Sequence, residues 1–263
     1  MDGPPLPRAD ASAPRTYAMP ESPALPAACE PPRWRLSGLM ATDEVSQARI
    51  DLAEPAMGVR VDDGGPGLKL LGLDVPEGCQ PAEAWARGDD LTAIYEPGDD
   101  RQLRIAAMWR VGQADERFPD VRSWQLILSA QTSLLSSLAE LSVESTGVGS
   151  VTTGVWREDH VDWQAATGPE ATCLRICNEA EPASCLVLAI HPDDAGRIEH
   201  GGGDNGSALL RCRLFPSALE KGVLLRSRVL VALGPAASRN TQVDGWEQLV
   251  LRQFAGSEPI LST

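Results

Sequence analysis

The fold is decided by the stretch Leu103–Arg110, which reads LRIAAMWR. Its apolar residues Leu103, Ile105, Ala107 and Trp109 alternate with a second, more mixed set of side chains. Side chains two residues apart share a face of a β-strand, because successive residues point to opposite faces. The stretch therefore predicts a strand with one buried face and one partly exposed face.

Short apolar runs of this kind recur along the chain, separated by clusters of Gly, Pro and Asp that favour turns. We predict strands at residues 58–61, 68–73, 91–95, 103–111, 124–130, 138–143, 173–177, 185–190, 209–215, 223–233 and 246–254. Residues 129–141 fit a helix or a strand, and this choice stays open. Because the strand–helix alternation of parallel sheets is missing, the pattern predicts an all-β protein, a large antiparallel β-sandwich with few short helices.

Residues 1–32 differ from the rest of the chain, because they hold nine of its 21 prolines and few apolar side chains. Proline cannot donate to a strand ladder, and a segment poor in apolar residues buries little surface. We expect an extended or disordered Pro-rich N-terminal arm over residues 1–32, followed by a single sandwich domain over residues 33–263.

The chain of 263 residues carries 23 Lys and Arg residues against 37 Asp and Glu residues, a formal net charge of −14. Nucleic acids and anionic membranes are bound through basic surfaces, so this balance argues against both as partners. Lys69 and Lys221 are the only lysines, a bias typical of GC-rich bacterial genomes. The N-terminus lacks a secretory signal pattern, so we expect a bacterial cytoplasmic protein with reduced cysteines.

Motifs that bind cofactors or metals in many enzymes are missing or fail in context. Gly201–Gly206 has the letters of a dinucleotide fingerprint, but that motif opens a helix, and residues 209–215 have the pattern of a strand. Cys173, Cys177 and Cys185 lack the two tight pairs of a zinc ribbon. We therefore expect no cofactor and no bound metal.

His191 is the candidate for acid–base chemistry. It follows an apolar strand, and Pro192 then turns the chain, so that Asp193 or Asp194 can fold back onto the imidazole. This arrangement predicts His191 as an acid or base, with Asp193 orienting it. In the alternative, which stays open, an aspartate caps the turn and His191 serves packing or hydrogen bonding.

Tryptophan supplies the candidate ligand surface, since seven of the chain's twelve aromatic residues are Trp. Trp109 and Trp124 lie inside predicted strands and are expected in the core. Trp156 and Trp163 flank a polar stretch that contains His160. An indole ringed by polar side chains can stack on the apolar face of a sugar, so these three residues are candidate carbohydrate ligands.

Four segments, at residues 90–96, 103–110, 190–194 and 219–226, resemble in their order a family of bacterial proteins to which no activity is assigned. The large antiparallel array is also similar, at the level of fold, to the supersandwich of galactose-mutarotase-like domains. That resemblance implies a His acid and a Glu base acting on a sugar, but it assigns no catalytic position in this sequence.

Three functional hypotheses follow. The first is a carbohydrate-binding β-sandwich whose surface contains Trp156, His160, Trp163 and His191. The second is a sugar-processing enzyme of epimerase or lyase type, in which His191 and Asp193 exchange protons with a sugar. The third is a protein-interaction or structural domain whose Pro-rich arm reaches a partner.

Overall fold

Strand β9 (Leu103–Val111) has the alternation that its sequence predicts, since every second residue is buried and those between are partly exposed. It pairs antiparallel with β8 (Asp90–Glu96) on one side and with β10 (Arg122–Thr132) on the other. These three strands are consecutive neighbours in the largest sheet, close to one of its edges.

The computed structural model describes residues 31–61, 68–113, 115–158, 160–164, 171–178, 184–202, 207–236 and 245–257. Residues 31–263 form one compact unit. Residues 1–30 lie outside the described residues. The extended or disordered arm expected over residues 1–32 therefore stays a prediction.

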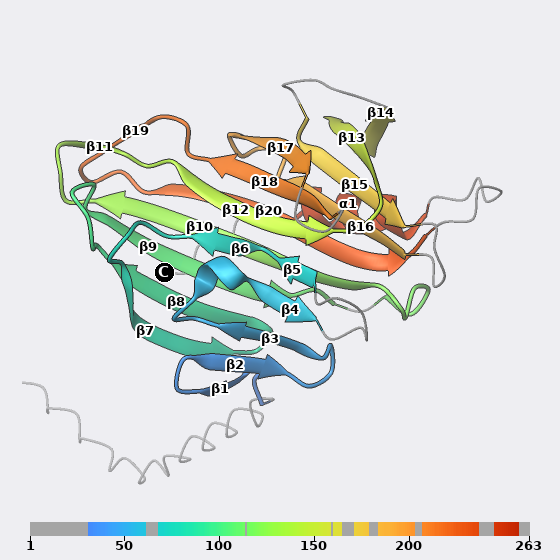
Figure 1. Cartoon of the computed structure of the whole chain (residues 1–263), viewed down its shortest axis with the longest axis horizontal. Helices are drawn as coiled ribbons and strands as arrows, with labels where there is room; N and C mark the ends of the chain where they lie inside the picture. The colour runs from blue at the N-terminus through green and yellow to red at the C-terminus, as the bar shows by residue number, and fades with distance from the viewer. Residues whose placement is uncertain are drawn as a thin grey trace, which may run out of the picture. The chain divides into compact units, whose positions relative to one another are not determined.

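The largest sheet has nine antiparallel strands (Figure 1). Their order is β14 (His160–Gln164), β13 (Ser150–Arg157), β15 (Cys173–Asn178), β16 (Ser184–Ile190), β20 (Leu225–Pro235), β10, β9, β8 and β7 (Gln80–Arg87).

Two smaller sheets form the second layer of the sandwich (Figure 1). One contains β1 (Arg35–Ser37), β2 (Met40–Asp43), β3 (Ala48–Asp51), β4 (Val59–Val61) and β5 (Leu68–Leu70). The other contains β17 (Gly196–Gly202), β18 (Ala208–Leu214), β12 (Leu141–Gly147) and β6 (Gly72–Asp74). A short ribbon of β11 (Ser136–Leu138) and β19 (Ala218–Glu220) and a 3-10 turn at Pro55–Met57 complete this part of the chain.

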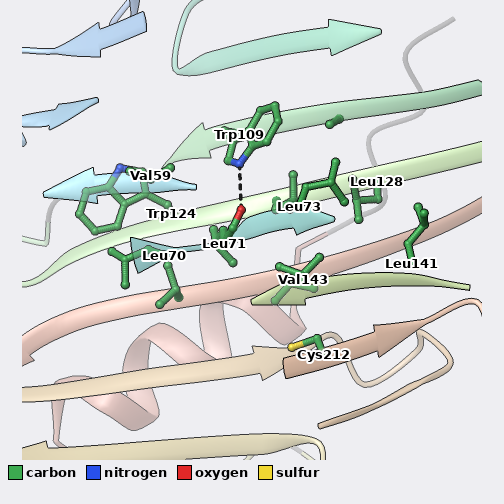
Figure 2. Packing of buried hydrophobic residues seen from close by; sticks show 14 of the residues in the cluster. Val59, Leu70, Leu71, Leu73, Trp109, Trp124, Leu128, Leu141, Val143 and Cys212 are labelled. Carbon is green, nitrogen blue, oxygen red and sulfur yellow. Dashed lines mark hydrogen bonds between the residues drawn. The ribbon is translucent and has the colours of Figure 1, made fainter. Parts of the chain in front are cut away.

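The main core lies between these two layers. Trp109 and Trp124 of the large sheet are fully buried in it, which confirms the sequence prediction for both. The Trp109 indole N–H donates to the carbonyl oxygen of Leu71 at 3.4 Å, across the core (Figure 2). The all-β antiparallel sandwich predicted from the sequence is therefore confirmed.

Residues 68–73, predicted as one strand, are divided between β5 and β6 at Leu71. Leu71 has a φ of 53°, a conformation that costs free energy in a residue with a branched side chain. Two buried hydrogen bonds hold it, because its carbonyl accepts from Trp109 and its N–H donates to Ser145 Oγ at 3.0 Å. The second bond ties the link between β5 and β6 to Ser145 of the strand that spans Leu141–Gly147.

The single α-helix of the described residues, α1 (Trp246–Ala255), packs on the opposite face of the nine-stranded sheet (Figure 1). The prediction of a strand at residues 246–254 is wrong. Trp246, Val250 and Phe254 are spaced by four residues and Leu251 lies beside them, a helical period that gives one apolar face. This face packs on Leu230 and on its apolar neighbours in β15, β16 and β20.

Residues 129–141, for which the sequence allows a helix or a strand, contain the end of β10, all of β11 and the start of β12.

Among the described residues, no helix has both the length and the apolar character that a membrane span requires.

Candidate functional site

The outer face of strands β7 to β10 forms the floor of a large groove. Its volume is about 1260 Å³. Helix α1 covers the neighbouring strands β20, β16 and β15 on the same face, but the groove lies beside it. The core-facing residues of β9 and β10 point the other way, so the groove is separated from the main core by one sheet.

Two neighbouring rows of side chains make up the floor. Each row consists of residues that lie directly opposite one another on paired strands. The first row contains Arg87, Asp90, Arg110, Gln125 and Leu230. The second row contains Trp85, Thr92 and Met108. The rows are two residues apart along each strand, which places both on the outer face.

Two elements wall the groove. Helix α1 contributes Leu249, Val250, Gln253 and Phe254. The connection between β9 and β10 contributes, among others, Asp115, Arg117, Phe118 and Val121. Walls and floor thus both combine apolar and polar side chains, a mixture that sites for small ligands also show.

Arg110 and Asp90 form an ion pair with two hydrogen bonds on the floor of the groove. Arg110 Nε donates to Asp90 Oδ1 at 2.6 Å, and Nη2 donates to Oδ2 at 2.8 Å. This hydrogen bonding raises the pKa of Arg110 above its ordinary value. Both side chains are about one-quarter exposed, so the fixed pair presents ionised groups to the groove.

Three other floor residues offer contacts to a ligand. Thr92 Oγ1 is buried and has no hydrogen-bond partner among the described residues. Gln125, in the row beside it, offers an amide that can both donate and accept. Trp85 lies directly opposite Thr92 and is 43% exposed, the only tryptophan among the exposed large hydrophobic residues of the described chain.

The charges that line the groove nearly cancel. Arg87, Arg110 and Arg117 face the acids Asp89, Asp90, Asp115 and Glu116. The Arg117 guanidinium hydrogen-bonds to Asp115 and lowers the pKa of that carboxyl to about 2. With most charges paired, the groove suits a neutral ligand better than a strongly charged one.

His191 does not line this groove. It is 2% exposed, and its Nδ1 lies 2.8 Å from Nη2 of Arg228. Because an arginine N–H can only donate, Nδ1 is the acceptor and carries no proton. The backbone N–H of Asp193 also donates to Nδ1, at 3.2 Å. The imidazole ring meets Phe254 edge-on, with ring centres 5.2 Å apart.

Arg228 is the centre of this buried cluster. It is 5% exposed, contacts both carboxylate oxygens of Asp194, and donates to the Ser257 carbonyl at 3.0 Å. Asp193 is different, since its side chain is 80% exposed and its Oδ2 lies 3.7 Å from His191 Nδ1. The cluster fastens the end of α1 to β20, and the acid–base role of His191 and Asp193 stays a prediction.

The tryptophans of the predicted ligand surface lie on the sheet face that carries α1, and both are only partly buried. The Trp156 indole N–H donates to the Ile190 carbonyl at 2.9 Å. The Trp163 ring lies over Gly154 on the neighbouring strand and under the Arg175 guanidinium, 4.9 Å from the ring centre. His160, at the start of β14, is exposed.

The structure thus brings Trp156 close to His191 through Ile190, but neither Trp156, His160 nor Trp163 lines the groove. The sequence pattern does not single out the groove residues Trp85, Asp90, Thr92, Arg110 and Gln125. They belong to the mixed, less apolar face of the alternating strands. The sequence alone does not distinguish such a face from an ordinary solvent-facing side.

No protein-family model matches the chain, and no curated protein matches it. Among solved structures, an Escherichia coli K12 protein described as a "putative aldose 1-epimerase" is similar over 70% of this chain and 82% of its own, at 13% identity and a TM-score of 0.39.

Two α-galactosidases are also similar. AgaA of Geobacillus stearothermophilus matches 66% of this chain and 29% of its own, at 10% identity and a TM-score of 0.34. The enzyme from Lactobacillus brevis matches 66% and 28%, at 9% identity and a TM-score of 0.35. This chain matches less than a third of either galactosidase, and likenesses at this level do not identify its function.

Proposed function

We propose that the protein binds neutral carbohydrate in the groove over β7 to β10. The observation that carries the proposal is the pair of Trp85 and Thr92 on opposed strands. An exposed indole lies beside a buried hydroxyl that has no partner among the described residues. An apolar plane next to unsatisfied hydrogen-bonding groups suits a sugar ring, which has C–H bonds on its faces and hydroxyls at its edge.

The remaining floor residues extend the same chemistry. Asp90 and Arg110 are fixed by their two hydrogen bonds, so they bind sugar hydroxyls without first losing conformational freedom. Charge-assisted hydrogen bonds to such groups are stronger than neutral ones. Gln125, next to Arg110 across β9 and β10, can accept from one hydroxyl and donate to another.

Binding, rather than catalysis, is the function that this groove supports best. No histidine is among the groove's lining residues in the described chain, and the Asp90 carboxylate is already held by Arg110. The sugar-processing enzyme and the protein-interaction domain stay as hypotheses from the sequence.

The test is binding of the full chain to an array of neutral oligosaccharides, followed by calorimetry on the best binder. Trp85→Ala is expected to weaken binding at least tenfold. Leu135→Ala is the matched control, because Leu135 is 85% exposed and does not line the groove. The control should bind as the wild type does. Absence of binding to every neutral glycan, or equal losses in both variants, would reject the proposal.

A further inference from the structure

Cys177 and Cys185 face each other directly on the neighbouring antiparallel strands β15 and β16. Their Sγ atoms lie 2.8 Å apart, and no disulfide joins the two cysteines. Directly opposed residues on antiparallel strands have Cα atoms about 4.5 to 5.5 Å apart, within the range that a disulfide spans. The backbone therefore needs no rearrangement to join them.

We propose that Cys177 and Cys185 form a reversible intramolecular disulfide, a modification site at the point where α1 begins. Cys177 is partly exposed and Cys185 is 1% exposed, so Cys177 is the sulfur that a dissolved oxidant reaches first. Cys185 then resolves the intermediate from inside the protein.

Glu247, in the first turn of α1, takes part in the arrangement. Its Oε1 lies 3.4 Å from Cys185 Sγ and accepts the hydrogen bond of the thiol. Its Oε2 accepts from Arg175 at 3.1 Å, which keeps this nearly buried carboxylate in place. The proton of Cys185 therefore has an acceptor within reach, although little water reaches the thiol.

The oxidant is a small disulfide, RSSR, such as oxidised glutathione. The Cys177 thiolate attacks one sulfur of RSSR, which forms a mixed disulfide and releases RS⁻. Cys185 passes its proton to Glu247, and its sulfur attacks Cys177 Sγ and releases the second RS⁻. In sum, two protein thiols are oxidised to one disulfide, and RSSR is reduced to two RSH.

A metal ion is a poorer fit for the same atoms, although Cys177, Cys185 and Glu247 lie close enough together to be considered as ligands. Two thiolates at 2.3 Å from one tetrahedral zinc ion lie about 3.8 Å apart, farther than these sulfur atoms are. Arg175 also engages Glu247, and its positive charge opposes a cation at this position.

The hydrogen-bonded contact to Cys177, burial and the neighbouring Glu247 raise the pKa of Cys185. Little of this thiol is therefore a thiolate near neutral pH, and we expect oxidation to accelerate as the pH rises.

The test uses the full chain in glutathione buffers that run from fully reduced to fully oxidised. Free thiols are then blocked with N-ethylmaleimide, and the protein is digested without reduction for mass spectrometry. We expect one peptide pair joined through Cys177 and Cys185, with the mass of two hydrogen atoms lost. The link closes a short loop, so the Tm should rise by roughly 5 °C.

Two variants sharpen the test. Cys177→Ser should abolish both the link and the rise in Tm, whereas Cys79→Ala should keep both, because Cys79 lies outside the cluster around α1. The proposal is overturned if both thiols remain labelled in every buffer, if a mixed disulfide with glutathione persists on Cys177, or if one equivalent of zinc protects the pair from labelling.

Discussion

Arg110 and Asp90 lie opposite one another on β9 and β8 and are joined by two hydrogen bonds of 2.6 and 2.8 Å. The pair sits on the floor of the groove, between Arg87 and Gln125 in the same row. It is partly exposed, so solvent reduces its contribution to stability, whereas its fixed geometry favours binding.

Asp90→Asn tests whether the pair contributes more to ligand binding than to stability. The variant removes the charge while keeping the shape, and we expect sugar affinity to fall by about tenfold or more, because a charge-assisted hydrogen bond is weakened. The free energy of unfolding should change by less than about 1 kcal/mol. Calorimetry and urea unfolding measure the two quantities.

Glu96→Gln is the matched control for Asp90→Asn. Glu96 pairs with Arg104 at 2.8 Å, on the same two strands but outside the groove. Its substitution should leave affinity unchanged. A loss of affinity as large as that of Asp90→Asn would show that the effect comes from charge in general and not from the groove.

Phe254→Ala tests the attachment of α1. Phe254 is 1% exposed, packs with the apolar residues of β16 and β20, and meets the His191 ring. Its truncation should lower the free energy of unfolding by about 3 to 5 kcal/mol. Gln253→Ala, one residue earlier on the exposed side of the helix, should change it by less than about 0.5 kcal/mol. Similar costs for both would mean that α1 is not anchored by its apolar face.

The buried cluster around His191 predicts a pH dependence of stability. Burial lowers the pKa of His191 from its ordinary value of 6.5, and Arg228 lowers it further, whereas Asp194, Asp193 and the Ala255 carbonyl oppose the shift. The folded state therefore resists protonation that the unfolded chain accepts. The contribution of neutral His191 to the free energy of unfolding is fully present above about pH 6.5, and it falls as the pH drops below that value.

Urea unfolding between pH 8 and pH 5 measures this slope. His191→Gln should remove part of it, because the titrating ring is gone. His200→Gln serves as the control, since His200 is exposed on β17, and it should leave the slope as it is in the wild type. An identical slope in all three proteins would contradict the role given to His191.

Much of the fold could be predicted from the sequence, because strands buried on one face impose a period of two. Leu103–Arg110 shows that period, and β9 follows it along its whole length. The sequence predicts a strand where α1 lies, because Leu249, Val250 and Leu251 are consecutive apolar residues, which a buried strand also shows.

The site was harder to predict than the fold. Trp85 and Thr92 carry no motif, and their importance depends on which half of the sheet α1 leaves uncovered. Asp193 does contact His191 as the turn at Pro192 suggests, but the decisive neighbour is Arg228, 37 residues away in the chain. Contacts of that kind depend on strand register, which local patterns do not specify.

The most direct test of the central claim is a crystal structure of the protein with the neutral oligosaccharide that binds it best. We predict a sugar ring stacked on Trp85, with its hydroxyls hydrogen-bonded to Thr92 and to the pair of Asp90 and Arg110. A sugar bound instead beside Trp156 and Trp163, or anywhere outside the groove, would contradict the account.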